Sequence, residues 1–501
     1  MSVNYLAVDL GAESGRVVLG RFDGERMTVE EVHRFPNVPV WVSGALYWDA
    51  LRIFQEVKTG LAKGGEAGDI SGVAIDSWGV DFALLDGEGE LLSNPRNYRD
   101  PRTDGMMEQA FRLVSREEIY RKTGIQFIQI NTLYQLLAMR DSPLLETADK
   151  LLLIPDLLNY WLTGEKVGEF TNVTTTQLYD LHTGDWARDL AGDMQIPGHI
   201  FPRIVQPATH LGPLASEVAE ETGLAEGTTV TAAASHDTAS AVVAVPAEGD
   251  DFAYISSGTW SLVGVEAPRP VLTPEAMHSN FTNEGGFGGK TRFLKNVMGL
   301  WLLQECRRTW AREGRDYSYE ELQQLAREAA PFGPLVDPDH PSFFSPGEMP
   351  SRIRWFCEAT GQRPPEGPAE ISRCVLESLA LKYRLVVEQA GEITGQSVDV
   401  VHVVGGGVRN EFLCQLTADA TRRPVRTEPA EATALGNLTV QAYAGGDLAS
   451  QEEIRAVVRR SVEVREYEPL GDESRWQEAL ERLRAAADEA PPQPDCGGES
   501  T

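Results

Sequence analysis

The sequence predicts an α/β protein made of two similar halves, each a mixed sheet flanked by helices, with a cleft between the halves. At 501 residues, the chain exceeds what one hydrophobic core usually holds. The first half opens with a strand, a turn of small polar residues and a second strand over 5–22, and the second half repeats this order over 252–264. Long stretches with helical spacing follow in both halves, which favours a duplicated α/β unit.

Hydrophobic spacing predicts the order of elements in the first half. Asp23-Gly24 is typical of a hairpin turn between two antiparallel strands. Strands are expected at 5–11, 16–22, 27–35, 70–78 and 228–234, and a hairpin at 82–92. Helices are expected at 49–62 and 238–245, and helical patterning dominates 106–162.

The second half is predicted to begin after a boundary marked by Pro246 to Asp250. Its expected helices lie at 300–313, 369–394, 410–420 and 472–488, with one more beginning at Glu431 and a buried strand at 400–404. The predicted domains are therefore 1–246 and 247–465, followed by a C-terminal helix at 466–489. The residues 490–501, rich in Pro, Gly and acids, are predicted to be disordered.

The composition excludes several classes of protein. A formal net charge of -30 and the lack of any Lys/Arg-rich block argue against nucleic acid as a partner. No apolar run approaches the roughly 20 residues that a membrane span needs. The N-terminal residues lack a basic region followed by an apolar stretch, so a cytoplasmic location is the expectation.

The cysteines do not follow a metal-binding or disulfide pattern. There are five, none forms a CxxC pair, and their number is odd, so neither a zinc site nor a disulfide framework is expected. Core or surface thiols are the simpler interpretation. Whether Cys357 and Cys374 pair stays open.

The segment Thr231-Ala-Ala-Ala-Ser-His-Asp-Thr-Ala-Ser240 carries the main catalytic candidate. Small apolar residues run into Asp237, and a helix is expected to begin directly afterwards. Open α/β folds place their chemistry at such strand ends, where an aspartate can accept a proton from a substrate hydroxyl. The alternative is a helix cap, because Ser, Asp and Thr all favour the N-cap position, and local pattern alone favours the cap.

Three turns share one design, in which a buried strand runs into small or hydroxylic residues that let the backbone approach a ligand. They are the segments 9–16, 256–259 and 405–407. Each alone is a weak signal, since glycine and serine turns join strands in many proteins. Asp9, just before the first turn, is a possible magnesium partner through water. None of the turns matches a Walker A loop, and the third does not match GxGxxG.

Phosphate binding by hairpin turns in two half-domains is the pattern of the superfamily of actin, hexokinase and the heat-shock ATPases, whose two domains are ribonuclease H-like. Within it, the chain resembles the FGGY carbohydrate kinases from about Tyr5 to about Val464. The resemblance rests on motifs in a fixed order: 8–16, 75–81, 98–100, 154–159, 172–176, 235–241, 254–262, 283–285, 296–301 and 405–410.

The resemblance is greatest to the family members that act on L-rhamnulose. It implies ATP-dependent phosphorylation of the 1-hydroxyl, giving L-rhamnulose 1-phosphate and ADP, as a step of L-rhamnose degradation. The implied cofactors are ATP as co-substrate and Mg²⁺. The implied partners are small molecules only, with a monomer or a homodimer expected.

The resemblance also implies roles for individual residues. Asp237 matches the general base, and Asp9 is the magnesium candidate. The positions matching sugar contacts are Gly79, Asp81, His236, Asp237 and Thr238. The positions matching ATP contacts are Ala12, Glu13, Ser14, Gly15, Arg16, Thr259, Asn296, Gln304, Gly405, Gly406 and Gly407. Glu13 departs from the small residue expected there, so its side chain is expected to point away from the phosphates.

Structural roles compete with some of these assignments. Asp81 and Trp78 could be core or capping residues, Arg16 could pair with an acidic neighbour, and His236 could be a core histidine. Asn159 and Asn172 are expected as turn or cap residues, and His278 and His402 as structural.

Other functions compete as well. One is a kinase of the same family for another ketose or polyol, such as L-fuculose, xylulose or glycerol. Another is a non-catalytic sugar or nucleotide sensor, against which the His236-Asp237 pair argues. A third is a chaperone-like ATPase, which would need an appended peptide-binding domain.

Overall fold

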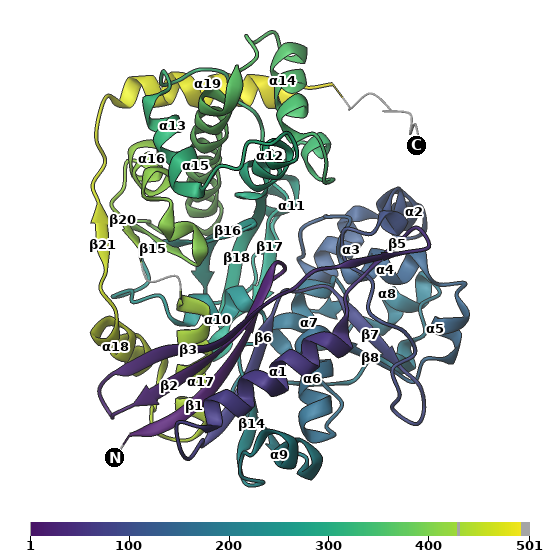
Figure 1. Cartoon of the computed structure of the whole chain (residues 1–501). Helices are drawn as coiled ribbons and strands as arrows, with labels where there is room; N and C mark the ends of the chain where they lie inside the picture. Colours follow the sequence, from purple (N-terminus) through teal and green to yellow (C-terminus); the bar gives the residue numbers. More distant parts are fainter. Residues whose placement is uncertain (1, 428–430, 492–501) are drawn as a thin grey trace. The chain divides into compact units, whose positions relative to one another are not determined.

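A computed structural model describes residues 2–427 and 431–491 of the chain (Figure 1). The strands are β1 (Val3–Leu10), β2 (Ser14–Phe22), β3 (Met27–Pro36), β4 (Val40–Val42), β5 (Ala45–Tyr47), β6 (Gly72–Ser77), β7 (Phe82–Leu85), β8 (Lys150–Leu153), β9 (Val167–Glu169), β10 (Tyr179–Asp180), β11 (Asp185–Trp186), β12 (Arg203–Val205), β13 (Thr209–Pro213), β14 (Thr229–Ala232), β15 (Phe252–Ser257), β16 (Trp260–Ala267), β17 (Thr282–Gly285), β18 (Thr291–Met298), β19 (Val400–Val404), β20 (Val425–Thr427) and β21 (Arg465–Tyr467).

The α-helices are α1 (Ala50–Gly65), α2 (Met106–Leu113), α3 (Arg116–Thr123), α4 (Thr132–Ala138), α5 (Pro143–Thr147), α6 (Ile154–Thr163), α7 (Phe170–Val173), α8 (Arg188–Asp193), α9 (Ser216–Thr222), α10 (Asp237–Val243), α11 (Pro274–His278), α12 (Trp301–Arg312), α13 (Tyr319–Glu328), α14 (Met349–Ala359), α15 (Gly367–Thr394), α16 (Glu411–Thr421), α17 (Ala432–Ala444), α18 (Gln451–Ser461) and α19 (Glu473–Glu489). No helix in the described part of the chain has the length and apolar character of a membrane span.

The described chain forms two compact units that are not continuous in sequence. The first contains the chain up to Glu248 together with 266–294 and 431–463, and the second contains 249–265, 295–430 and the residues from Val464 on. Strands β16 and β18 each run from one unit into the other. The continuous domains expected from the sequence are a different division and stay a prediction, and the predicted disordered tail lies outside the described residues from 492 on.

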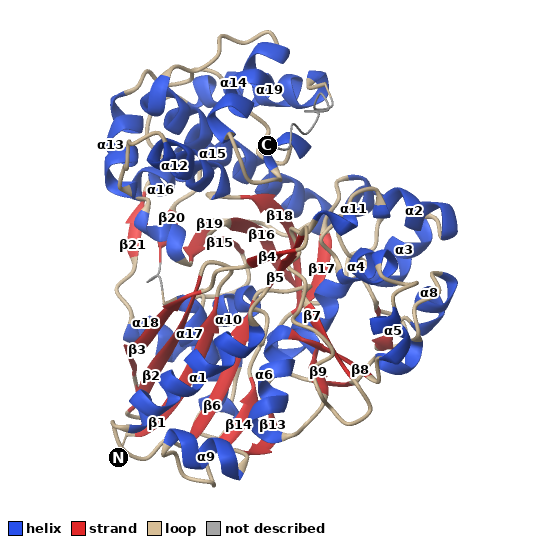
Figure 2. Cartoon of the chain, turned by 45° about the vertical axis from the view of Figure 1, so that its right-hand side comes forward, coloured by secondary structure: helices blue, strands red, loops and turns tan. Residues whose placement is uncertain are grey.

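The first unit is built on a six-stranded sheet in the order β13-β14-β6-β1-β2-β3 (Figure 2). The strands β14, β6 and β1 are parallel, while β2 and β3 continue the sheet as antiparallel hairpins. The three opening strands therefore occur as predicted. The Asp23 side chain accepts hydrogen bonds from the N–H groups of Glu25 and Arg26, which stabilises the predicted hairpin turn.

Helices cover both faces of this sheet. Helix α1 packs on one face, where a Cβ placed on Gly60 would lie 2.2 Å from the Val17 side chain. Helix α17 packs on the other, where a Cβ on Gly20 would lie 2.7 Å from Leu438. Because side chains alternate along a strand, Val17 and Gly20 of β2 point to opposite faces. The burial of both faces accounts for the apolar runs of the central strands.

The second unit repeats the opening of the first. Strands β15 and β16 form an antiparallel hairpin, β19 and β20 continue it in parallel from β15, and β21 closes the edge antiparallel to β20. The order β16-β15-β19-β20 thus matches β2-β1-β6-β14 in the first unit, strand for strand and direction for direction. The predicted duplication of a mixed sheet flanked by helices is confirmed.

The structure confirms some predicted elements and corrects others. The hairpin expected over 82–92 is confirmed: an antiparallel bridge joins Leu85 to Leu91, and the Leu92 N–H donates to the Leu84 carbonyl at 3.0 Å. Strand β7 also pairs with β8, a pairing that the local pattern did not predict. The helical pattern over 106–162 is interrupted by β8 and by loops. Strand β8 was missed because its partner β7 lies some 65 residues earlier in the chain, and local pattern does not reveal such a pairing.

Candidate active site

Carboxylates gather where the parallel strands of the first unit end. Asp9 of β1 and Asp76 of β6 are direct partners in the parallel ladder, near the carboxyl ends of both strands. The next strand, β14, leads into Ala233 to His236 and then to Asp237. A bridge between Ser77 and His236 continues the strand pairing up to this point. The topology therefore brings three aspartates from distant parts of the sequence to one edge of the sheet.

Asp237 is the first residue of α10, and the N-cap residue is His236, without a capping hydrogen bond from its side chain. The expectation that Ser235 or Thr238 caps this helix, or that Asp237 does, is wrong. Helix α10 packs tightly against α17. A Cβ on Gly436 of α17 would lie 1.8 Å from the Ser240 carbonyl oxygen, so only glycine permits this contact.

The segment before Asp237 is held by the buried Glu169. Its carboxylate accepts hydrogen bonds from the Ser235 N–H (3.0 Å) and hydroxyl (2.7 Å) and from the N–H and hydroxyl of Thr171. The Thr171 hydroxyl oxygen in turn accepts from the His236 N–H at 3.1 Å. Burial raises the pKa of Glu169, and these donors work against that rise. This network fixes the position of the two residues, Ser235 and His236, that directly precede Asp237.

The His236 ring is oriented by two residues of the hairpin β17–β18. Arg292 Nη2 lies 3.0 Å from His236 Nδ1 and 3.1 Å from the Glu284 carboxylate. Nδ1 also lies 3.4 Å from Glu284 Oε2. A guanidinium can only donate, so the shorter Arg292 contact favours Nδ1 as acceptor and, in a neutral ring, the proton on Nε2. That nitrogen lies 3.5 Å from Asp237 Oδ1. The ring therefore presents an N–H beside the candidate base.

The Asp237 side chain is partly exposed, and its pKa is raised above the ordinary value of an aspartate. Its side chain keeps 32% of its surface exposed, so it can meet a ligand. Desolvation raises the pKa of Asp237, His236 lowers it, and the nearby charge of Asp9 raises it further. Its Oδ1 accepts hydrogen bonds from the N–H and hydroxyl of Thr238. No described residue donates to Oδ2, so that oxygen is available to a substrate hydroxyl.

Asp9 and Asp76 differ in their partners. Arg16, opposite Asp9 in the β1–β2 ladder, donates from Nε at 2.9 Å and from Nη2 at 2.6 Å to Asp9 Oδ2. Asp76 is fully buried and accepts from Asn437 Nδ2 at 2.6 Å. Burial and the charge of Asp9 raise the pKa of Asp76 well above its ordinary value, against the effect of Asn437.

The turn between β1 and β2 is held by backbone and side-chain hydrogen bonds. The Gly11 N–H donates to the Ser14 carbonyl at 2.9 Å, and Asn37 Nδ2 donates to the Gly11 carbonyl at 3.0 Å. Gly15 is required by packing, since a Cβ there would lie 2.3 Å from the Phe35 ring. Glu13 is exposed, and its expected orientation away from the phosphates stays a prediction.

Among the predicted sugar contacts, Gly79 and Asp81 have different environments. A Cβ on Gly79 would lie 2.9 Å from the Thr175 hydroxyl, so the turn needs glycine. Asp81 is only 1% exposed. Its carboxylate accepts hydrogen bonds from four donors: Trp48 Nε1, Trp78 Nε1, the Tyr98 N–H and Gln135 Nε2. Burial raises the pKa of Asp81 to about 6. These contacts favour the structural alternative, in which Asp81 holds the turn that carries Gly79.

In the second unit, two of the predicted nucleotide turns lie against each other. The turn 256–259 joins β15 to β16, and the glycines 405–407 follow β19, the neighbour of β15. A Cβ on Gly407 would lie 2.0 Å from the Ser257 hydroxyl, and Gly405 has a left-handed φ of 82°. The Thr259 carbonyl accepts hydrogen bonds from the N–H groups of Gly299 and Trp301. Asn296 of β18 and Gln304 of α12 lie on the two elements that flank this contact.

Several residues of this region were missed in the sequence. Glu169 holds Ser235, and Glu284 and Arg292 lie beside His236. Of these three residues, only Glu284 lies in one of the family motifs, the segment 283–285.

Asn159 and Asn172 are neither turn nor cap residues, because both are fully buried inside helices and their amide groups have no hydrogen-bond partner among the described residues. His402 is structural as expected, buried on β19 against Phe252. Cys357 and Cys374 are both free and buried.

The donor set of the strand ends fits a magnesium ion held largely by water and phosphate. The part of the chain that the structure describes contains no group of three or more His, Cys, Asp or Glu residues with metal-binding geometry. Asp9 is a hard oxygen ligand, and Arg16 engages only its Oδ2. Mg²⁺ commonly binds through one or two carboxylates and keeps several waters, so Asp9 suffices as the protein partner.

Comparisons with known proteins identify the class. The family model of the N-terminal domain of the FGGY carbohydrate kinases matches residues 4–244, and that of the C-terminal domain matches 253–445. The chain belongs to the FGGY family of carbohydrate kinases. It is therefore a phosphotransferase that uses ATP on a small sugar, with the two-domain fold of that family.

Particular relatives extend this likeness over nearly the whole chain. A rhamnulokinase of Bacteroides thetaiotaomicron is 44% identical over 483 residues, which are 96% of this chain and 98% of the relative. A rhamnulokinase of Halalkalibacterium halodurans is 43% identical, covering 93% and 99%. Among solved structures, a ligand-bound xylulose kinase from Lactobacillus acidophilus matches with a TM-score of 0.79 at 18% identity, covering 97% of both chains. That likeness confirms the fold.

Proposed function

We propose that this chain transfers a phosphoryl group from ATP to the 1-hydroxyl of L-rhamnulose, with Asp237 as the general base. The observation that carries the proposal is the place of Asp237: a partly exposed carboxylate at the parallel strand ends, with one oxygen free, beside the His236 N–H. The full-length likeness to relatives named rhamnulokinase supports the choice of sugar.

In this proposal, Asp237 Oδ2 accepts the hydrogen bond of the 1-hydroxyl and takes its proton as the oxygen attacks the γ-phosphorus. Thr238 keeps the carboxylate in place through Oδ1. His236 donates from Nε2 to a sugar oxygen, since Arg292 occupies the other ring nitrogen. Phosphoryl transfer requires alignment and neutralisation of charge more than covalent help, so such fixed groups are sufficient.

The phosphates are assigned to backbone N–H groups of the turn Ala12 to Arg16. Glu13 contributes only its backbone, because a carboxylate facing phosphates would repel them. When bound, Mg²⁺ neutralises charge on the phosphate oxygens, with Asp9 as its partner through water. The nucleotide itself is assigned to Thr259, Asn296, Gln304 and the turn 405–407. Gly79, at a turn held by Asp81, is assigned to the sugar.

The pH dependence of kcat/KM follows from the role of Asp237. A general base works in its ionised form, so activity falls as pH drops through its pKa. Desolvation, as the first cause, raises the pKa of Asp237. The acid limb of kcat/KM is therefore expected at a pH above 3.8, the ordinary value of an aspartate. It is measured by ADP release at constant ionic strength, with enzyme returned to neutral pH as the control for unfolding. A limb at or below the ordinary value contradicts the role.

A panel of substrates tests the proposed sugar. ADP release is measured with ATP and L-rhamnulose, L-fuculose, D-xylulose or glycerol, with phosphate position determined by ³¹P and ¹³C NMR of the product. The expected result is the highest kcat/KM for L-rhamnulose, with the phosphate on O1. The Asp237→Asn protein serves as the blank for ATP hydrolysis by contaminants. A higher kcat/KM for any of the other three contradicts the proposal.

A further inference from the structure

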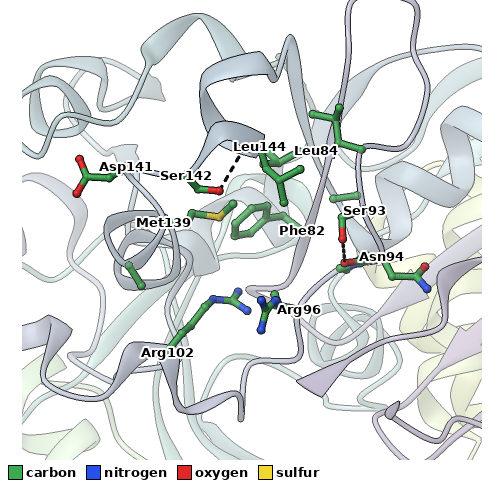
Figure 3. A pocket seen from close by; sticks show the side chains of 14 residues that line it. Phe82, Leu84, Ser93, Asn94, Arg96, Arg102, Met139, Asp141, Ser142 and Leu144 are labelled. Atoms are coloured by element: carbon green, nitrogen blue, oxygen red, sulfur yellow. Dashed lines mark hydrogen bonds between the residues drawn. The ribbon is translucent and has the colours of Figure 1, made fainter. Parts of the chain in front are cut away.

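The first unit contains a cavity of about 430 Å³ that no step of the proposed reaction uses. Its lining comes from β7, the segment 92–96, Arg102, the end of α4 and the residues around α5 (Figure 3). The volume lies in the range of sites for small organic ligands. The predicted sugar and ATP contacts are not among its lining residues.

Most of the cavity wall is apolar. Phe82 and Leu84 of β7 form one side, with Leu92, Met139 and Leu144 around them. Figure 3 shows the Met139 side chain against the Phe82 ring, with Leu84 and Leu144 beside it. Such a wall favours a ligand with an aromatic or aliphatic body, since apolar surface removed from water contributes about 25 cal/mol per Å².

Two guanidinium groups lie together at one side of this wall. Figure 3 shows Arg96 and Arg102 next to each other beside the Phe82 ring. Desolvation by burial lowers the pKa of Arg102 to about 10, and the positive charge of Arg96 contributes to this decrease, against the opposing effects of Asp81 and Asp100. Proteins often bind a carboxylate or a phosphate with neighbouring guanidinium groups that are partly removed from water.

The carboxylate of Asp100, which contacts both arginines, is already engaged. Asp100 Oδ2 accepts hydrogen bonds from the Leu46 N–H at 2.7 Å and from Arg96 Nη1 at 3.2 Å. Its Oδ1 accepts from the Arg102 N–H at 3.1 Å and lies 3.9 Å from Arg102 Nη1, too far for a hydrogen bond. The lining carboxylate, Asp141, is 89% exposed and has Arg140 as its ion-pair partner.

Arg102 therefore has N–H groups that could still donate hydrogen bonds to a ligand. Its Nη2 donates to Gln135 at 2.6 Å, while its Nε and Nη1 are buried and have no hydrogen-bond acceptor among the described residues. Leaving a buried donor without an acceptor is unfavourable, so an acceptor supplied by a ligand is favoured there. Nε and one Nη of a guanidinium form the edge that binds both oxygens of a carboxylate or phosphate.

We infer that this cavity binds a small organic anion, a carboxylate or phosphate monoester with an apolar body, through the Nε–Nη1 edge of Arg102. Arg96 adds positive charge beside the anion. The apolar body packs against Phe82, Leu84 and Met139. The site is separate from the residues proposed for sugar and ATP, so the inference does not rest on the proposed function.

The test measures binding without turnover, by isothermal titration of the full chain with benzoate and with phenyl phosphate. Benzamide and benzyl alcohol are the neutral analogues of similar shape. ATP and L-rhamnulose are present at saturation in a parallel titration with the Asp237→Asn protein, so that binding at the reaction site is recognised. The expected result is that at least one anion binds about tenfold or more tightly than its neutral analogue, with or without the substrates.

Two variants locate the binding. Arg102→Met is expected to weaken anion binding about tenfold or more, which corresponds to the loss of a charge-assisted hydrogen bond. Arg140→Met is the matched control, because it removes the same charge from a neighbouring residue that does not line the cavity. Ala138→Phe fills the cavity from its lining without changing charge and is expected to abolish binding, which keeps the test valid if Arg102→Met does not fold.

The outcomes are distinct. Preference for benzoate over phenyl phosphate, or the reverse, identifies which anion the Arg102 edge accepts, and both support the site. Anions that bind no better than neutral analogues overturn it. Binding that Ala138→Phe leaves intact, or that saturating substrates abolish, overturns it as well, since the anion then lies elsewhere.

Discussion

Replacing Asp237 by asparagine is expected to lower kcat by roughly 10²–10⁴, the usual effect of losing a general base. The fold should persist, because asparagine keeps an oxygen that accepts the Thr238 N–H and the rest of the segment is held by Glu169. Binding of L-rhamnulose and of ATP is expected to change little. Steady-state ADP release measures kcat, and calorimetric titration measures both affinities.

Asp189→Asn is the matched control for this variant. Asp189 also lies in the first turn of a helix of the first unit, α8, but its side chain is 67% exposed and its partner is Lys122. The same chemical change there should leave kcat within a factor of about two, since an exposed ion pair contributes at most about 1 kcal/mol. Near-normal turnover by the Asp237→Asn protein would remove Asp237 from the role of base.

Replacing Arg292 by methionine is expected to lower the free energy of unfolding by about 3–5 kcal/mol, because the buried Glu284 loses the cation that compensates it. Arg292 is fully buried, and its Nη2 contacts both Glu284 and His236 Nδ1. Without that donor, the Glu284 carboxylate, 3.4 Å from Nδ1, favours a proton on Nδ1, so Nε2 loses its proton and kcat/KM for the sugar should also decrease. Urea unfolding measures stability, and ¹⁵N chemical shifts of the imidazole report the tautomer.

A double variant separates the two effects of Arg292. Arg292→Met with Glu284→Met removes both charges and leaves neither polar side chain beside His236 Nδ1, so much of the stability should return, while the His236 tautomer is unrestrained and kcat/KM stays low. Arg292→Lys keeps a donor and should retain the Nε2–H tautomer. If the double variant recovers full activity together with stability, Arg292 has only a structural role.

The sequence was sufficient for the order of elements and for the strand-end position of Asp237. The strands β1, β2 and β3 were predicted because their hydrophobic periodicity and the Asp23-Gly24 turn are local signals. The motif order from Asp9 to Asn410 likewise identified the family that the comparisons confirm. The roles assigned to the individual site residues stay predictions.

Local pattern did not reveal what depends on distant partners. The cap of α10 was misplaced because the N-cap residue is His236, whose side chain makes no capping bond, while local pattern favours Ser, Asp or Thr there. The pairing of β7 with β8 was missed because several helices separate the two strands in the sequence. For Asp81, the sequence left open whether the residue contacts the sugar or belongs to the core. The four donors that surround its carboxylate come from four separate segments of the chain.

By itself, then, the sequence determined the duplicated α/β plan, the turns of small residues after buried strands, and the aspartate at the end of one of them. Each is encoded within a dozen neighbouring residues, through periodicity and turn chemistry. Tertiary structure alone decided that Asp9 and Asp76 become ladder partners, that Arg292 determines the proton position of His236, and that Glu169 holds Ser235. The physical reason is that these contacts join residues tens of positions apart, which only packing and strand pairing bring within hydrogen-bond distance.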